Sequence, residues 1–330
     1  MTTTRPTDLG SALTELAGTG ARPRAGGTDL TACVAHGVLA PAPVVDLTGI
    51  ETLRGIDWRD DGSARVGALT SVHEVSADPR LGAAYPALAR TAGALATPQI
   101  RRTATVGGNL LQRNRCWYLR NPAFDCFQTG GGSCPAREGD HLHGVVVDQG
   151  PCVAPHPSTV ALALVAYDAV VEVSGDGGAV AERPVAGLYD GTDPSRDHVL
   201  DPSEVVTAVS LPAPAPGELA AYLRATGRSR SEWPLVEVTA RLVRAEGGAG
   251  PVASAAVAVG GVARTPLRLP EVESSLVGAV PGAEPGAGFA AALDGLAARC
   301  SPLPATGYKV ALLRETVRAG VERALGFARA

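Results

Sequence analysis

Four of the chain's six cysteines lie in one loop-like segment, and they are the residues best suited to chemistry. They are Cys116, Cys126, Cys134 and Cys152. Their spacing, C-x9-C-x7-C-x17-C, lacks the tight C-x2–4-C pair that is typical of structural zinc sites. Iron–sulfur clusters are held by four thiolates, and wide spacing on loops suits them. The spacing therefore favours an iron–sulfur site over zinc, with ordinary buried cysteines as the alternative.

Two histidines and three arginines accompany these cysteines. His141 and His143 lie between the third and fourth cysteines and could replace one of them as a ligand, although surface histidines are the simpler interpretation. Arg113, Arg115 and Arg120 would offset the negative charge of a thiolate-bound metal, or would form a solvated face.

Two short segments combine a hydroxyl residue with a pair of glycines. The first is Ala25, Gly26, Gly27, Thr28, Asp29 and Leu30, and the second contains Thr105, Gly107, Gly108 and Asn109. Glycine permits positive φ and a close approach of ligand to backbone, and successive N–H groups form an anion-binding nest. Neither segment is the G-x-G-x-x-G fingerprint or a P-loop. Together they predict two turns that bind the pyrophosphate of a dinucleotide, with ordinary glycine turns as the alternative.

Composition narrows the class of protein. A length of 330 residues predicts two domains, and 45% hydrophobic with 19% charged residues is typical of a globular chain. A net charge of -4 argues against nucleic acid as the main partner. The N-terminus shows no secretory signal and the longest apolar run, around 160–171, is too short to span a bilayer. We therefore expect a cytoplasmic protein, in which disulfides are rare.

The elements that must position these residues follow from hydrophobic periodicity and turn signals. Helices are predicted at 10–18, 82–96, 158–169, 269–280, 286–299 and 306–327. Strands are predicted at 42–50, at the start of 63–77, as a hairpin at 170–185, and at 234–245 and 251–262. Pro98 is expected to end the helix before it or to lie just past it, and 211–220 to be a linker. The long irregular segment 99–152 is typical of a functional region.

Several segments, in order, resemble the FAD-binding subunit of the molybdenum hydroxylases, the family of xanthine dehydrogenase and carbon monoxide dehydrogenase. They are "PRAGGTDL", "TPQIRRTATVGGNLLQRNRCWYLR", "CVAPHPSTVALALVAYDA", "YLRATGRSRSEWPLVEV", "AVGGVARTPLR" and "GYKVALLRETVRAGVERAL". Among these proteins, the chain looks most similar to the FAD subunit of periplasmic-type bacterial aldehyde oxidoreductases, which carries an additional 4Fe-4S cluster.

The resemblance implies an α+β fold. Residues 1–213 would form a two-subdomain FAD-binding domain of the vanillyl-alcohol-oxidase-like (PCMH) type, with a 4Fe-4S insertion at about 112–152. Residues 217–330 would form a smaller α+β domain similar to the C-terminal domain of the carbon monoxide dehydrogenase flavoprotein.

The resemblance also implies roles for single residues. The two glycine segments would wrap the FAD pyrophosphate and ribityl chain, with Gln99 and Ile100 just before the second. Thr159 and Arg224 match positions near the flavin where the family usually has an acid and a lysine. The four clustered cysteines would hold the 4Fe-4S cluster.

These roles describe an electron-transfer subunit whose redox chemistry takes place at flavin N5 and at the cluster, with no catalytic side chain. Its partners would be a small 2Fe-2S subunit and a large molybdopterin subunit. Two alternatives stay open. A stand-alone flavoenzyme acting on a small organic molecule would use Trp233, Glu232, Tyr118 and Thr159 to line a substrate pocket. A non-catalytic binding protein would keep the fold without the cofactor.

Overall fold

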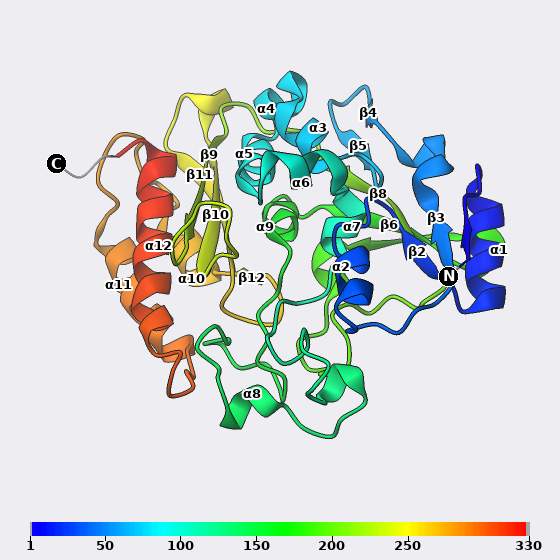
Figure 1. Ribbon diagram of the computed structural model, residues 1–330. Helices are drawn as coiled ribbons and strands as arrows, with labels where there is room; N and C mark the ends of the chain where they lie inside the picture. Colours follow the sequence, from blue (N-terminus) through cyan, green and yellow to red (C-terminus); the bar gives the residue numbers. More distant parts are fainter. Residues whose placement is uncertain (1, 328–330) are drawn as a thin grey trace.

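The computed structural model describes residues 2–327 and contains three β-sheets with helices packed on and between them (Figure 1). The first sheet is small and parallel, in the order β1-β3-β2. Its strands are β1 (Thr3–Thr4), β2 (Arg22–Arg24) and β3 (Val44–Asp46). The helix α1 (Leu9–Thr19) packs its buried apolar face on this sheet, and α2 (Leu30–Ala35) follows the first glycine segment.

The second sheet is antiparallel, in the order β4-β5-β8-β6-β7. Its strands are β4 (Ile56–Trp58), β5 (Ala64–Gly67), β6 (Val170–Ser174), β7 (Val180–Pro184) and β8 (Val205–Leu211). Three helices share a hydrophobic core with this sheet: α3 (Val72–Ala77), α4 (Pro79–Ala84) and α5 (Pro86–Ala94).

The third sheet is also antiparallel, in the order β12-β11-β10-β9, and has its own hydrophobic core. Its strands are β9 (Leu219–Ala225), β10 (Val236–Arg244), β11 (Val252–Gly260) and β12 (Leu267–Arg268). The helices of this part are α10 (Pro270–Ser275), α11 (Ala287–Gly295) and α12 (Tyr308–Leu325). None of the described helices is long and apolar enough to cross a membrane.

The helix α9 (Thr159–Ala166) joins the second and third cores. All of its residues are buried, and it packs against α5 on one side and against β10 and β11 on the other (Figure 1). A helix that is apolar on every face is expected in the interior. It therefore fixes how the two larger sheets face each other.

The structure confirms a mixture of helices and sheets and most of the predicted elements, but it corrects three details. The predicted helix 82–96 is two helices, broken where Pro86 begins α5. Pro98 lies just past α5, as expected, but the segment predicted as irregular from residue 99 starts with a helix, α6 (Pro98–Thr103), which Pro98 begins because proline at the first helical position loses no hydrogen bond. Gly107 and Gly108 lie in the short helix α7 (Val106–Leu110), capped by Thr105, and not in a turn.

Residues 112–157, here called the cysteine segment, are irregular apart from the short helix α8 (Pro135–Glu138) and a 3-10 turn, Phe127–Thr129, so the irregular structure predicted for 99–152 is confirmed only from residue 112 onward. It lies at the bottom of Figure 1, below α9 and the third sheet. The N–H groups of Val146 and Val147 donate to the carbonyl of Val262, and that of His156 donates to the carbonyl of Ala263. The segment is thus attached by backbone hydrogen bonds to the loop that follows β11.

Lys309, the only lysine of the chain, is buried at the start of α12. Its Nζ donates to the carbonyls of His143, Gly144 and Gly261 at 3.0, 2.9 and 2.9 Å. Burial lowers the pKa of this ammonium group to about 7. The three bonds use all three of its donors and join α12, the cysteine segment and the end of β11.

Replacing Lys309 tests the connection that it makes between α12, the cysteine segment and the end of β11. We expect Lys309→Met to lower the free energy of unfolding by about 3 kcal/mol, because three buried carbonyls lose their donor. Arg314→Met on the same helix is the control, since that side chain is 45% exposed and pairs only with surface acids. Chemical denaturation measures both. Equal stability of the two variants would contradict the claim that Lys309 holds these three parts together.

Candidate cofactor site

The two glycine segments line one groove, here called the glycine groove, of about 320 Å³. Residues 25–30 form one wall, and Thr105, Gly107 and Gly108 form part of another. Arg113 and residues of the 198–206 stretch complete it. The structure therefore brings together the two segments that the sequence paired.

Close packing explains the glycines better than turn geometry does. A Cβ on Gly26 would lie 1.8 Å from the carbonyl oxygen of Thr103, so only glycine lets the first segment reach the loop before the second. A Cβ on Gly107 would lie 2.9 Å from the Ala68 side chain. Gly27 is the one of the four with positive φ, +69°. The absence of a side chain at Gly26 therefore lets the backbone of the first glycine segment approach that of residues 103–104 at the edge of the groove.

Asp29 connects the glycine groove to the cysteine segment. Its carboxylate accepts the backbone N–H of Arg113 at 2.8 Å, the guanidinium of Arg120 at 2.9 Å and that of Arg115. Burial opposes ionisation of Asp29, but the charges of Arg115 and Arg120 outweigh it and hold its pKa below the usual range. Asp29 was predicted to bind cofactor. In the structure its side chain holds the arginines of the cysteine segment.

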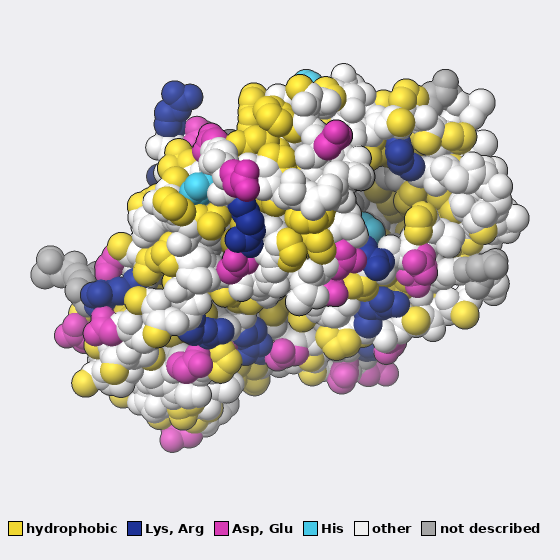
Figure 2. Space-filling model, turned by 90° about the horizontal axis from the view of Figure 1, so that it is seen from below, with side chains coloured by type: hydrophobic (Ala, Val, Ile, Leu, Met, Phe, Trp, Pro, Cys, Tyr) yellow, Lys and Arg dark blue, Asp and Glu magenta, His cyan; other side chains and the backbone are white. Residues whose placement is uncertain are grey.

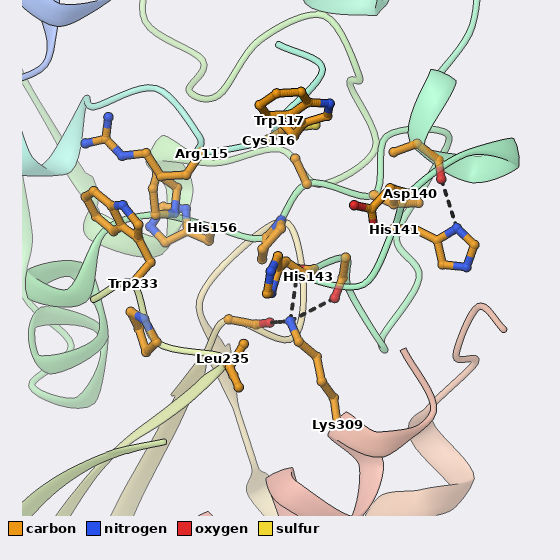
Figure 3. Close-up of a pocket in the computed structure, with 18 of the residues that line it drawn as sticks. Arg115, Cys116, Trp117, Asp140, His141, His143, His156, Trp233, Leu235 and Lys309 are labelled. Carbon is orange, nitrogen blue, oxygen red and sulfur yellow. Dashed lines mark hydrogen bonds between the residues drawn. The ribbon is translucent and has the colours of Figure 1, made fainter. Parts of the chain in front are cut away.

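A second cavity, here called the tryptophan cavity, lies on the far side of Arg115 and has a volume of about 330 Å³ (Figure 3). It is lined by Trp117, Tyr118, His156, Glu232, Trp233, Glu237 and Lys309, among others. The guanidinium of Arg115 stacks 4.1 Å from the centre of the Trp233 ring, and it also donates to Gln112, a residue of the glycine groove. Arg115 therefore spans the wall between the two cavities.

Two buried groups of the tryptophan cavity are chemically unusual. Burial lowers the pKa of His156 to about 3, and its Nε2 has no hydrogen-bond partner among the described residues. Burial also raises the pKa of Glu237, which accepts the Tyr222 hydroxyl at 2.6 Å and bonds to the Thr159 side chain.

Five of the predicted cofactor residues do not line the glycine groove. Gln99 and Ile100 are exposed on α6. The Asn109 side chain accepts the Ser158 hydroxyl at 2.8 Å and so anchors the start of α9. Arg224 donates to the carbonyl oxygens of Ala94, at 2.6 Å, and Glu232, and Thr159 is buried beside Glu237.

The four clustered cysteines line a third, small cavity, here called the cysteine cavity. Its other walls include Asn114, Gln128 and Pro194. The Cys152 thiol donates to the sulfur of Cys134, which lowers the pKa of Cys134 to about 5 and raises that of Cys152. Within residues 2–327, however, no three His, Cys, Asp or Glu side chains are grouped closely enough to form a ready metal site. The metal assignment of these cysteines therefore stays a prediction.

Other expectations for the cysteine segment need correction. Neither His141 nor His143 lines the cysteine cavity; His141 bonds to backbone groups, and His143 lines the tryptophan cavity. The three arginines neutralise Asp29 and Asp197, not the clustered cysteines. The guanidinium that does contact one of these sulfurs belongs to Arg264, which sequence reasoning missed because it lies far along the chain.

Comparisons with known proteins agree with this geometry. Residues 1–214 match the family described as the FAD binding domain in molybdopterin dehydrogenase. The chain belongs to this family. It is 36% identical over 251 residues to the aldehyde oxidoreductase FAD-binding subunit PaoB of Escherichia coli, covering 75% of this chain and 76% of that protein. It is 38% identical over 109 residues to the carbon monoxide dehydrogenase medium chain of Afipia carboxidovorans, covering 32% of this chain and 37% of that protein.

A solved carbon monoxide dehydrogenase from Hydrogenophaga pseudoflava has the same fold, with a TM-score of 0.75 and 24% identity over 99% of this chain and 97% of that chain. Membership of the molybdopterin dehydrogenase FAD-binding family confirms the prediction of an FAD-dependent oxidoreductase subunit. The descriptions of these relatives name FAD for the subunit of this type and do not mention a 4Fe-4S cluster in it.

Asp29→Asn tests the connection between the glycine groove and the cysteine segment. At neutral pH we expect a loss of about 3 kcal/mol in the free energy of unfolding, because two partly buried guanidinium groups lose their counter-charge. The folded-state pKa of Asp29 is lowered, so its contribution is present above the ordinary value of 3.8 and is lost as pH falls below it.

The difference between wild type and Asp29→Asn should therefore shrink with acidification, as measured by denaturation at several pH values. Asp57→Asn is the control, because its carboxylate is 72% exposed and lies 3.6 Å from Arg65. A difference that is constant with pH would refute the role of the charge.

Proposed function

We propose that this chain is the FAD-binding electron-transfer subunit of a molybdenum-dependent oxidoreductase that acts on aldehydes or related small molecules. The observation that carries the proposal is the glycine groove, where two glycine segments far apart in sequence pack against each other. The relatives described as FAD-binding subunits of aldehyde oxidoreductase and xanthine dehydrogenase support the reaction class.

Bound FAD would supply the transfer of one or two electrons. The backbone of residues 25–28 and of 105–108 borders the groove and would receive the pyrophosphate, since exposed N–H groups and glycines suit a phosphate anion. The Arg113 side chain lines the same groove and adds positive charge. We propose that the flavin end reaches toward the tryptophan cavity, with Thr159 and Arg224 near it as the resemblance implies, and that Gln99 and Ile100 contact the cofactor just before the second glycine segment.

We also propose that Cys116, Cys126, Cys134 and Cys152 hold a 4Fe-4S cluster. The donor set fits, because four thiol groups from a loop segment line one cavity that is mostly shielded from solvent. A cubane cluster occupies the space between its four cysteine ligands. In the chain without the cluster, the four cysteines are therefore expected to line one cavity. Insertion requires the sulfurs of Cys134 and Cys152 to separate.

The partners in this proposal are a large molybdopterin subunit and a small 2Fe-2S subunit. The relatives support a multi-subunit enzyme through their descriptions as an FAD-binding subunit and as a medium chain. We further propose the division into a PCMH-type FAD-binding domain, 1–213, and a C-terminal domain, 217–330. The separate hydrophobic cores of the second and third sheets support this division.

A stand-alone flavoenzyme is the second candidate, because three of its four expected pocket residues, Tyr118, Glu232 and Trp233, line one cavity, whereas Thr159 does not. Turnover of small organic substrates by the purified chain without other subunits would favour it. Co-purification with a molybdopterin subunit, and no turnover alone, would favour the electron-transfer role.

Thr28→Glu tests the glycine groove. Thr28 is exposed and lines the groove, so a carboxylate there would repel the pyrophosphate without disturbing the core. We expect the affinity for FAD to fall at least about tenfold, measured by titrating the apoprotein with FAD. Thr14→Glu, on the exposed face of α1, is the matched control and should bind as wild type does. Equal affinity of both variants would show that FAD phosphates bind elsewhere.

Cys126→Ser tests the cysteine cavity. We expect the iron and acid-labile sulfide content of the anaerobically purified chain to fall sharply while most FAD stays bound, because Cys126 lines the cysteine cavity and not the glycine groove. Cys300→Ser is the control, since Cys300 lies outside both cavities. An iron-free wild-type chain would refute the cluster, and joint loss of iron and FAD would refute the separation of the two sites.

A further inference from the structure

Arg264 is a buried cation in direct contact with one of the clustered cysteines. It lies in the loop between β11 and β12, is 7% exposed, and its Nη1 donates to Cys152 Sγ at 2.8 Å. Its Nη2 donates to the backbone carbonyls of Asp193 and Arg196 at 2.9 and 2.8 Å. Among the described residues no carboxylate pairs with this guanidinium, so its positive charge faces a sulfur and two neutral carbonyls.

The two carbonyls give Arg264 a second effect on the cysteine cavity. Asp193 and Arg196 flank Pro194, which lines the cavity opposite the cysteine segment. The next residue, Asp197, accepts hydrogen bonds from Asn114 and Gln128, two more lining residues, at 2.8 and 2.9 Å. Arg264 therefore fixes the loop that closes the cavity as well as contacting a ligand sulfur.

The position of Arg264 is set by the backbone on its N-terminal side. The carbonyls of Val262 and Ala263 accept N–H groups of the cysteine segment, as described above. On its other side, Thr265 N–H donates to Gln149 Oε1 at 3.1 Å. The guanidinium is thus attached to the same segment that carries Cys152 and cannot move independently of it.

We infer that Arg264 is a positioning residue that sets the reduction potential of the proposed four-thiolate cluster, an inference that rests on the proposed function. A cluster held by four thiolates is negatively charged, and reduction adds one electron and no proton, which makes the site more negative. A buried cation and an N–H···S hydrogen bond stabilise that extra charge, so they raise the potential. The effect is large where water is excluded, because the local dielectric is low.

Another arginine of the chain shows what makes Arg264 different. Arg120 also donates to a cysteine sulfur, that of Cys33, at 2.8 Å. Its charge is compensated by Asp29, and Cys33 lies outside the cysteine cavity. Among the described residues, Arg264 is the only buried arginine that has no paired carboxylate and that contacts one of the clustered cysteines.

The test is a redox titration of the full chain, purified anaerobically with dithionite as reductant and followed by electron paramagnetic resonance. We expect Arg264→Gln to lower the reduced-to-oxidised ratio at a fixed potential at least about tenfold, which is about 59 mV for one electron. Arg264→Lys keeps the charge without the planar fork and should fall between that variant and wild type. Arg299→Gln is the control, since that side chain is 37% exposed, pairs with Glu271 at 2.9 Å and lines none of the three cavities.

Iron and FAD contents of each variant separate a shift in potential from a loss of structure. An unchanged potential in both Arg264 variants, with iron retained, would overturn the inference and leave the proposed cluster intact. Loss of iron from the lysine variant as well would make Arg264 only a structural residue and would also overturn it. A folded wild-type chain that binds FAD but no iron would overturn the cluster itself, a distinguishable result.

Discussion

The carboxylate of Asp29 is the contact on which the arrangement of the site depends. It lies in the first glycine segment, yet its three partners belong to the first part of the cysteine segment. Without it, the partly buried Arg115 and Arg120 would have no counter-charge, at a cost of about 3 kcal/mol. Because Arg115 also stacks on Trp233, the position of the tryptophan cavity relative to the glycine groove follows from the same carboxylate.

Buried positive charge is handled in three ways in this chain. The arginines at Asp29 are neutralised by an acid, and Lys309 is solvated by three backbone carbonyls. Arg264 has two carbonyls and a sulfur but no acid. An isolated buried cation is costly unless something negative accompanies it. A thiolate-ligated group in the cysteine cavity would supply that negative charge, and so the electrostatics of Arg264 and the donor set of the cysteines support the same proposal.

The sequence alone could predict those helices and strands that are determined by the local pattern of apolar residues. The uniformly apolar run that forms α9, the amphipathic α12 and the strands β10 and β11 were all predictable, because burial imposes periodicity. The pairing of the two glycine segments was also predictable from their shared residue types. The helical state of Gly107 and Gly108 was not predictable, because glycine disfavours helices. Only the tight contact with Ala68 explains why position 107 of this helix is a glycine.

Tertiary contacts determine the rest. Asn109 looked like a ligand contact but instead anchors α9, which lies much further along the chain. Asp197, Arg264 and Lys309 belong to neither the glycine segments nor the cysteine cluster, and each acts through partners more than forty residues away in sequence. No local signal marks such residues. Lys309 alone gave a hint, because a single lysine in a chain whose other cations are arginines suggests a position where the compact ammonium is needed.

One short stretch explains why a glycine segment and a cysteine cluster are neighbours in this sequence. Arg113 lines the glycine groove, Arg115 lines the tryptophan cavity, and Cys116 lines both the tryptophan cavity and the cysteine cavity. A few consecutive residues thus border all three cavities. Electron transfer needs redox groups held close together by rigid surroundings, and a continuous backbone fixed by Asp29 and Asp197 provides that rigidity.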